Sequence, residues 1–352
     1  MSKGLIFITG ATGFIGSATA VEALKSGYRL RICVRKPSQQ LETLLSEYTN
    51  QLEFVIVPDL TDETAFDGKL DGVDYVLHLA SPLPHGTNKE SYFNPAVKGT
   101  TAVLKAAEKV PSIKKVVVTA SIASLIPLGG IPEGGVIKGS ASHTSPVALQ
   151  WQRVLTKGIE DNDWDFSVDE NGSFEDPQNP AATPMKLYLA SKLLSNNAAW
   201  EFRAATKPHF ALVTLHPAFV YGHNLVQTSA EGVKYGSNGN LWSLIMQANP
   251  NASTTGVHIQ DVAEAHIKAL DPKIVDGSKY LLAGPKTTGS EIARIVHKLY
   301  PDSGALINED SQGFAMPNDT TKAETELGMK WRSVETMVRE VMDQQLGFLQ
   351  GN

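Results

Sequence analysis

The sequence predicts an α/β protein with a doubly wound parallel sheet and a smaller C-terminal lobe. Short apolar stretches without polar alternation recur between predicted helices, as in parallel sheets that are covered on both faces. A glycine-rich turn joins the first apolar stretch to the segment that follows it. The chain has 352 residues, which suffice for one large core or for two unequal lobes.

The first half of the chain alternates predicted strands with predicted helices. Apolar stretches predict strands at residues 5–9, 30–34, 52–57, 75–79 and 116–119. The segments between them predict helices at residues 17–26, 41–48 and 94–109. Ligands of such sheets bind at the carboxyl ends of the strands. The residues expected at those ends are Gly10, Arg35, Asp59, Ala80 and Ser121.

The second half is less regular. Residues 122–183 are rich in Gly, Pro, Ser and Asp, and we expect mostly loop there, with short helices around residues 148–157. Thr183 and Pro184 predict an N-cap and a first-turn proline for a helix that ends near Ala205. Further strands are predicted at residues 210–215 and 279–283, and further helices at residues 241–247, 257–270, 291–299 and 334–349.

Composition and charge exclude several classes of protein. A net charge of −6 and the absence of a basic cluster argue against nucleic-acid binding. Cys33 is the one cysteine, so we expect no internal disulfide and no metal site. Residues 1–10 belong to the first strand and not to a signal peptide, and no apolar run reaches the ~18 residues of a membrane span. We therefore expect a cytoplasmic protein, either a monomer or a homodimer.

The glycine-rich turn predicts a dinucleotide site. Gly10, Gly13 and Gly16 follow the first strand directly. Glycines allow a sharp turn and a close approach to a ligand, and the helix N-terminus presents free N–H groups to a pyrophosphate. The spacing differs from the usual Gly-x-Gly-x-x-Gly fingerprint, and a purely structural turn is the alternative.

We therefore assign residues 1–220 to a dinucleotide-binding domain of the Rossmann type. It carries a long insertion near residues 122–183, and residues 257–270 are expected to return to it. Residues 221–352 are assigned mostly to a substrate-binding lobe.

A tyrosine and a lysine further along the chain predict proton-transfer chemistry. Tyr188 and Lys192 lie four residues apart on a predicted helix and therefore share a face. A phenol with a pKa of about 10 is a poor acid unless a neighbouring ammonium stabilises its anion. Such pairs also arise by chance on amphipathic helices. The preceding dinucleotide turn favours the catalytic interpretation.

A serine after the fifth strand completes the candidate site. The hydroxyl of Ser121 is placed to donate a hydrogen bond to a substrate carbonyl, where negative charge develops. A capping role for Ser121 is the alternative. Ser124 is the competing candidate for the same role.

Together these residues resemble the extended short-chain dehydrogenase/reductases. Within them the chain is most similar to the dihydroflavonol-4-reductase and cinnamoyl-CoA-reductase group, which includes fungal aldehyde and methylglyoxal reductases. The resemblance covers residues 3–345, and its most specific stretches are residues 34–37, 58–62, 78–82, 94–100, 188–200, 216–222 and 257–263.

The resemblance implies roles for individual residues. Ser121, Tyr188 and Lys192 would be the catalytic triad, with Lys192 also binding the ribose. The residues implied in cofactor binding are Gly10, Thr12, Gly13, Phe14, Ile15, Gly16, Arg35, Lys36, Asp59, Leu60, Ala80, Ser81, Pro82, Thr119, Tyr188, Lys192, Pro217, Ala218 and Val220. Ala120 departs from the serine usual in the plant enzymes, and the interval from Ser121 to Tyr188 is longer. The plant enzymes' substrate recognition therefore does not carry over.

Arg35 and Lys36 predict NADP(H) as the cofactor. An acidic residue at the end of the second strand would bind the ribose 2′-hydroxyl and favour NAD. A planar, permanently charged guanidinium instead suits a 2′-phosphate. A solvated surface arginine is the alternative.

The predicted function is the transfer of hydride from NADPH to an aldehyde or ketone, with a small-molecule carbonyl compound as the substrate. An NAD-retaining epimerase or dehydratase of the same fold is one alternative, and a non-enzymatic redox sensor is another. Residues 129–132 and 137–142 are expected to form a flap over the substrate, and the alternative is that the apolar residues Leu125, Ile126, Leu128 and Ile131 are ordinary core.

Overall fold

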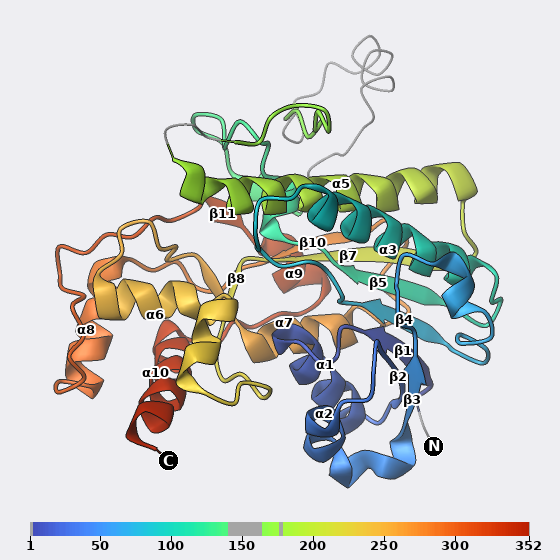
Figure 1. Cartoon of the computed structure of the whole chain (residues 1–352), viewed down its shortest axis with the longest axis horizontal. Coiled ribbons are helices and arrows are strands. Elements are labelled where there is room, and N and C mark those ends of the chain that lie inside the picture. The colour runs from blue at the N-terminus through green and yellow to red at the C-terminus, as the bar shows by residue number, and fades with distance from the viewer. Residues whose placement is uncertain (1–2, 140–163, 176–178, 352) are drawn as a thin grey trace.

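A seven-stranded parallel sheet forms the centre of the protein (Figure 1). The computed structural model describes residues 3–139, 164–175 and 179–351. The strands of this sheet are β1 (Leu5–Thr9), β2 (Arg29–Val34), β3 (Leu52–Ile56), β4 (Tyr75–His78), β5 (Lys115–Thr119), β7 (Ala211–Pro217) and β10 (Lys279–Leu282). Their order across the sheet is β10-β7-β5-β4-β1-β2-β3, and each neighbouring pair is parallel.

The chain changes its direction of travel across the sheet between β1 and β4. It first runs outward from β1 to β3 and then returns to add β4 on the other side of β1. Ligands of such sheets bind at the carboxyl edge, where the direction of travel changes. This topology confirms the predicted doubly wound class.

Helices cover both faces of the sheet, which explains why its strands are apolar throughout. On one face lie α1 (Phe14–Lys25) and α7 (Ile259–Lys268), and on the other lie α3 (Glu90–Glu108) and α5 (Thr183–Thr206) (Figure 1). Alternate side chains of β1 enter the two cores that result. Ile6 and Ile8 are fully buried with the α1 and α7 side chains, and Phe7 is fully buried on the opposite face.

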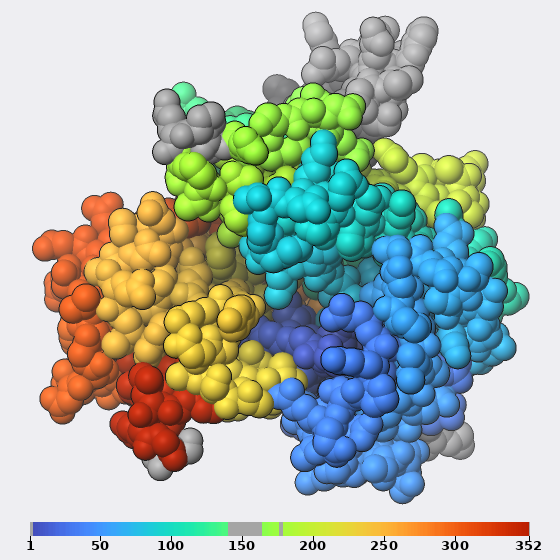
Figure 2. Space-filling model, in the orientation of Figure 1, coloured from blue at the N-terminus to red at the C-terminus, as the bar shows by residue number. Residues whose placement is uncertain are grey.

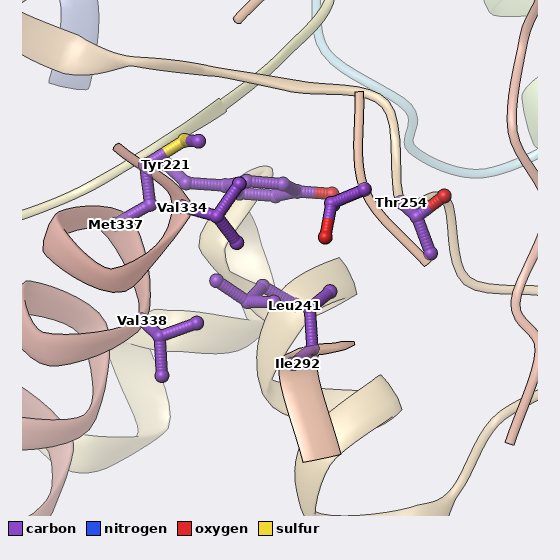
Figure 3. Close-up of a pocket in the computed structure, with 8 residues that line it drawn as sticks. Tyr221, Leu241, Thr254, Ile292, Val334, Met337 and Val338 are labelled. Carbon is purple, nitrogen blue, oxygen red and sulfur yellow. The ribbon is translucent and has the colours of Figure 1, made fainter. Parts of the chain in front are cut away.

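A smaller lobe follows β7. It contains β8 (Phe219–Tyr221), which pairs in parallel with β9 (Gly256–His258). Its helices are α6 (Asn238–Gln247), α8 (Gly289–Leu299) and α10 (Val334–Gln350), and they enclose a core of their own. A small, mostly apolar cavity lies in this core and is lined by Tyr221, Leu241, Thr254, Thr287, Ile292, Val334, Met337 and Val338 (Figure 3). None of these lining residues is a predicted site residue.

Part of the insertion is attached to the C-terminal half. Strand β6 (Ile137–Lys138) pairs in parallel with β11 (Asn318–Asp319). A Cβ added to Gly139 would lie 2.8 Å from the backbone nitrogen of Leu281 in β10, so this close approach requires a glycine. The remaining helices of the described residues are α2 (Gln39–Leu44) and α9 (Thr321–Glu326), with 3₁₀ turns at Ser46–Gln51, Glu63–Phe66, Ile122–Leu125, Pro180–Ala182 and Ala230–Tyr235.

Several predicted boundaries differ from the structure. The helix expected at residues 257–270 begins only at Ile259, because residues 256–258 pair with β8 as strand β9. Helix α1 begins three residues earlier than expected, directly after Gly13. Thr183 is the first residue of α5 and not its N-cap, since a 3₁₀ turn runs into the helix. Residues 279–282, within the segment assigned mostly to the smaller lobe, form β10 of the main sheet.

The short helices expected around residues 148–157 lie outside the described residues. No helix in the described part of the chain combines the length and the apolar composition needed to cross a membrane.

Candidate active site

The turn after β1 is a backbone cradle that only glycine can build. Gly10 has a φ of +79°, and a Cβ added there would lie 2.6 Å from the backbone nitrogen of Ala80. A Cβ on Gly16 would lie 2.0 Å from the carbonyl oxygen of Gly10. Side chains at these two positions are therefore excluded by the loop after β4 and by the turn itself.

The N-terminus of α1 is open to a ligand. Gly13 is the N-cap and makes no side-chain hydrogen bond to the helix. The first backbone N–H groups of the helix therefore remain free to bind a ligand. A Cβ added to Gly13 would meet nothing nearer than the Gly10 carbonyl oxygen at 3.4 Å, so the space beside this position is open. Free amides at a positive helix end fit a pyrophosphate, and the predicted residues Thr12, Phe14 and Ile15 lie in this turn.

The loop after β4 is tied to this turn by Thr9. The Thr9 hydroxyl accepts a hydrogen bond from the Ala80 backbone amide at 3.3 Å and lies 2.9 Å from Nδ1 of His78. Burial, reinforced by the nearby Lys192 ammonium, lowers the pKa of His78 to about 4. The imidazole is therefore neutral at physiological pH. The loop that carries Ala80, Ser81 and Pro82 is partly exposed at the carboxyl edge.

Ser121 follows β5 and serves two hydrogen bonds. Its hydroxyl accepts the backbone N–H of Ala123 at 3.1 Å and so caps the 3₁₀ turn at residues 122–125. The same side chain lies close enough to the Tyr188 phenol to act on its pKa, which it lowers. The Ala123 amide occupies one lone pair of the hydroxyl, so the hydroxyl proton remains available for donation to a neighbouring oxygen. Ser121 therefore caps the turn, as the alternative interpretation expected, and also contacts the Tyr188 phenol.

Tyr188 and Lys192 lie on one face of α5, as their spacing predicts. The Lys192 ammonium is 5.8 Å from the centre of the Tyr188 ring. Burial raises the pKa of Tyr188, and the hydrogen bond with Ser121 acts in the opposite direction. Lys192 is 6% exposed, and desolvation lowers its pKa to about 8. A half-buried phenol beside a serine hydroxyl and a desolvated ammonium is an arrangement for transferring one proton.

Ser124, the competing candidate, has a hydroxyl that is already engaged in hydrogen bonds within the protein. It is fully buried, and it donates its single proton to the Ser121 carbonyl oxygen at 2.7 Å. Its oxygen lies 2.9 Å from Nδ1 of His216. Both hydrogen-bonding functions of Ser124 are therefore used within the protein.

Two exposed cations stand at the end of β2. Arg35 and Lys36 form no hydrogen bond or ion pair with any residue in the described ranges. Asp59, after β3, is exposed, and its Oδ1 accepts both the amide and the hydroxyl of Thr61 at 2.8 Å. Its second carboxylate oxygen stays available, and Leu60 beside it is half-buried. At this edge of the sheet the two cations after β2 can bind a phosphate, and the residues after β3 can bind an adenine base.

Comparisons with known proteins agree with this geometry. Residues 6–148 match the NAD dependent epimerase/dehydratase family. Over 351 residues the chain is 58% identical to the ketoreductase sphI of Aspergillus fumigatus, with 99% of each chain covered. It is 29% identical to the cinnamoyl-CoA reductase CAD2 of Medicago truncatula, covering 96% of this chain and 94% of that one. The structure of Gre2 from Candida albicans in complex with NADPH matches with a TM-score of 0.75 at 25% identity, covering 98% of this chain and 99% of that one.

The chain belongs to the extended short-chain dehydrogenase/reductase family. It is an oxidoreductase of a family that depends on a nicotinamide dinucleotide. The resemblance inferred from the sequence motifs is thereby confirmed. Among the residues that the structure describes, no group of three His, Cys, Asp or Glu side chains is arranged to hold a metal.

The segment that family resemblance places along the nicotinamide lies where β7 meets the smaller lobe. Pro217 is the last residue of β7, and the amide of Ala218 donates to the Leu282 carbonyl at 2.9 Å. Ala218 and Val220 are buried. Thr119, also expected near the cofactor, lies 2.6 Å from Nε2 of His266 through its hydroxyl.

The apolar residues after Ser121 differ in burial. Leu125 is fully buried, whereas Leu128 is 39% exposed. Ile126 and Ile131 are partly buried and pack on a cluster that includes Ala218 and Leu193 of α5. Core and surface thus meet in one segment, directly behind the candidate nicotinamide site.

Sequence reasoning missed the polar network behind the site. His78, His216 and His266 are buried, and each lies within hydrogen-bond distance of a threonine on a strand. The available signal was a threonine at or near the end of β1, β5 and β7, since a buried imidazole needs a partner.

Proposed function

We propose that this protein is an NADPH-dependent carbonyl reductase that converts an aldehyde or ketone to an alcohol. The observation that carries the proposal is the cluster of Ser121, Tyr188 and Lys192 at the carboxyl edge of the sheet, beside an open glycine turn. The names of relatives support it, since sphI is a ketoreductase and the Candida albicans Gre2 structure holds NADPH.

Each member of the cluster has a separate role in the proposed reaction. NADPH bound in the crevice supplies the hydride. Ser121 and Tyr188 donate hydrogen bonds to the carbonyl oxygen, where negative charge develops. Tyr188 then gives its proton to that oxygen. The Lys192 ammonium stabilises the resulting phenolate and holds a ribose hydroxyl.

The substrate reaches this cluster from the space between the two halves of the protein. Figure 2 shows a recess between the C-terminal segments, in yellow and orange, and the N-terminal segments, in blue and cyan, with dark-blue early residues at its floor. We propose that residues 221–352 supply most of the substrate-binding wall.

The direct test is oxidation of NADPH in the presence of a panel of aldehydes and ketones, followed at the absorbance of the reduced nicotinamide. We expect at least one aldehyde or ketone to be reduced to its alcohol with consumption of one NADPH per product. Product analysis by mass spectrometry gives the stoichiometry. Cofactor that stays bound through purification, with no net oxidation on any carbonyl compound, would instead favour the epimerase or dehydratase alternative.

Arg35 predicts the choice between the two cofactors. Arg35→Ala should raise the KM for NADPH by about 10-fold or more and leave that for NADH little changed, because only NADPH carries the 2′-phosphate that a guanidinium binds in bidentate fashion. The measurement is steady-state kinetics with each cofactor.

Arg29 provides the matched control for this measurement. It is an exposed arginine at the first position of β2, at the opposite end of the strand from Arg35. Arg29→Ala should leave both KM values unchanged. An equal loss with NADPH and NADH in Arg35→Ala would contradict the assignment of the 2′-phosphate site.

A further inference from the structure

His216 lies directly behind the candidate catalytic serine. It is on β7, is fully buried and has three polar neighbours. Its Nε2 lies 2.8 Å from the hydroxyl of Thr214, and its Nδ1 lies 2.9 Å from the hydroxyl of Ser124 and 3.2 Å from the carbonyl oxygen of Ser121. The imidazole thus connects the strand that precedes Pro217 to the turn that begins at Ser121.

The neighbours of His216 determine where its proton lies. The Ser121 carbonyl can only accept, and the single proton of Ser124 is already donated to that carbonyl. Nδ1 therefore carries the proton, and Nε2 accepts the proton of Thr214. Burial lowers the pKa of His216 to about 3, and the positive charges of Lys192 and Lys279 act in the same direction. The ring remains neutral, with one fixed donor directed at Ser124 and Ser121.

The donors converge on a single atom, the carbonyl oxygen of Ser121. The backbone amide of Ser124 donates to it at 2.9 Å, the Ser124 hydroxyl at 2.7 Å, and Nδ1 of His216 completes the set at 3.2 Å. This carbonyl belongs to the residue whose hydroxyl contacts Tyr188. Small displacements of a group that must meet a transition state are costly, of order 10²-fold for about 1 Å.

We propose that His216 is a positioning residue, which holds the Ser121 backbone so that the Ser121 hydroxyl meets the substrate carbonyl together with Tyr188. The inference rests on the proposed function, because it requires Ser121 to act in carbonyl reduction. His216 itself touches neither the substrate nor Tyr188, and its effect passes through Ser121 and Ser124.

Two polar substitutions of His216 distinguish the contribution of Nδ1 from that of Nε2. In His216→Asn the amide nitrogen occupies a position equivalent to Nδ1, so the donor to Ser124 and Ser121 is retained. In His216→Gln the amide reaches the Nε2 position beside Thr214, and the Nδ1 donor is lost. We expect kcat to fall about 10- to 100-fold in His216→Gln and only a few-fold in His216→Asn, with the Kd for NADPH unchanged in both.

His266 supplies a control matched for burial and contacts. It is also fully buried, with Thr119 on Nε2 and the Val262 carbonyl on Nδ1, and it has no contact with Ser121. His266→Gln should lower the melting temperature as His216→Gln does and leave kcat near that of the wild type. Equal loss of kcat in His266→Gln and His216→Gln would overturn the proposal, since burial alone would then explain the effect.

A double-mutant cycle tests the route through Ser121. In a Ser121→Ala background, His216→Gln should cost little further kcat, because the hydroxyl that it positions is already gone. The same fold loss in both backgrounds would overturn the positioning role while leaving the proposed function intact. Wild-type turnover in Ser121→Ala alone would instead remove the role of Ser121 on which both depend.

Thr214→Val provides a second variant should His216→Gln fail to fold. It removes the hydrogen bond between the Thr214 hydroxyl and Nε2 of His216. We expect kcat to fall several-fold, whereas unchanged kcat would overturn the proposal.

Discussion

Tyr188→Phe should fold normally, bind NADPH and lose most carbonyl reduction. Phenylalanine keeps the ring and its packing on α3 and α5 side chains but removes the proton that the reaction needs. General acid catalysis contributes about 10²–10⁴-fold, so kcat should fall within or beyond that range. The measurement combines kcat on the best substrate with the Kd for NADPH from fluorescence titration and with thermal unfolding.

Tyr28 offers a control for this change. It is a partly buried tyrosine that packs edge-to-face on Tyr75 at the amino end of the sheet. Tyr28→Phe should leave kcat unchanged. If Tyr188→Phe reduced its best substrate at the wild-type rate, the proposed proton transfer would be wrong and a dinucleotide-binding protein without this chemistry would remain.

Ser121→Ala should lower kcat by about 10²-fold or more, because a donor aimed at the developing oxyanion is lost. NADPH binding should change little, since the glycine turn and the cations after β2 are untouched. The change also removes the cap on the Ala123 amide, which costs about 1 kcal/mol of stability. Thermal unfolding therefore has to accompany the kinetics, so that a loss of folded protein is not counted as a loss of turnover.

Ser124→Ala is the informative companion to this variant. Its hydroxyl is committed to the Ser121 carbonyl and to His216, so we expect a smaller loss of kcat than in Ser121→Ala. Near wild-type turnover in Ser121→Ala together with an inactive Ser124→Ala would show that the wrong hydroxyl had been chosen.

Local sequence patterns were sufficient to predict those features that depend only on neighbouring residues. The strand at Leu5–Thr9 and the glycine turn after it were predicted correctly, because apolar content and the steric needs of a tight turn are properties of neighbouring residues. Tyr188 and Lys192 share a face of α5 because of helical periodicity alone. The helix expected at residues 257–270 failed at its start for the opposite reason. Residues 256–258 are strand only because β8, distant in the sequence, pairs with them.

The sequence by itself determined the doubly wound class, the glycine turn after the first strand and the family, since each depends on short motifs and on their order along the chain. Only the tertiary structure decided that the Ser121 hydroxyl meets Tyr188 and that Ser124 does not. Only the tertiary structure also showed the buried pairs His78–Thr9 and His266–Thr119 and the place of β10 beside β7. These features depend on how strands and helices pack against one another, and the free energy of that packing comes from contacts between segments far apart in the chain.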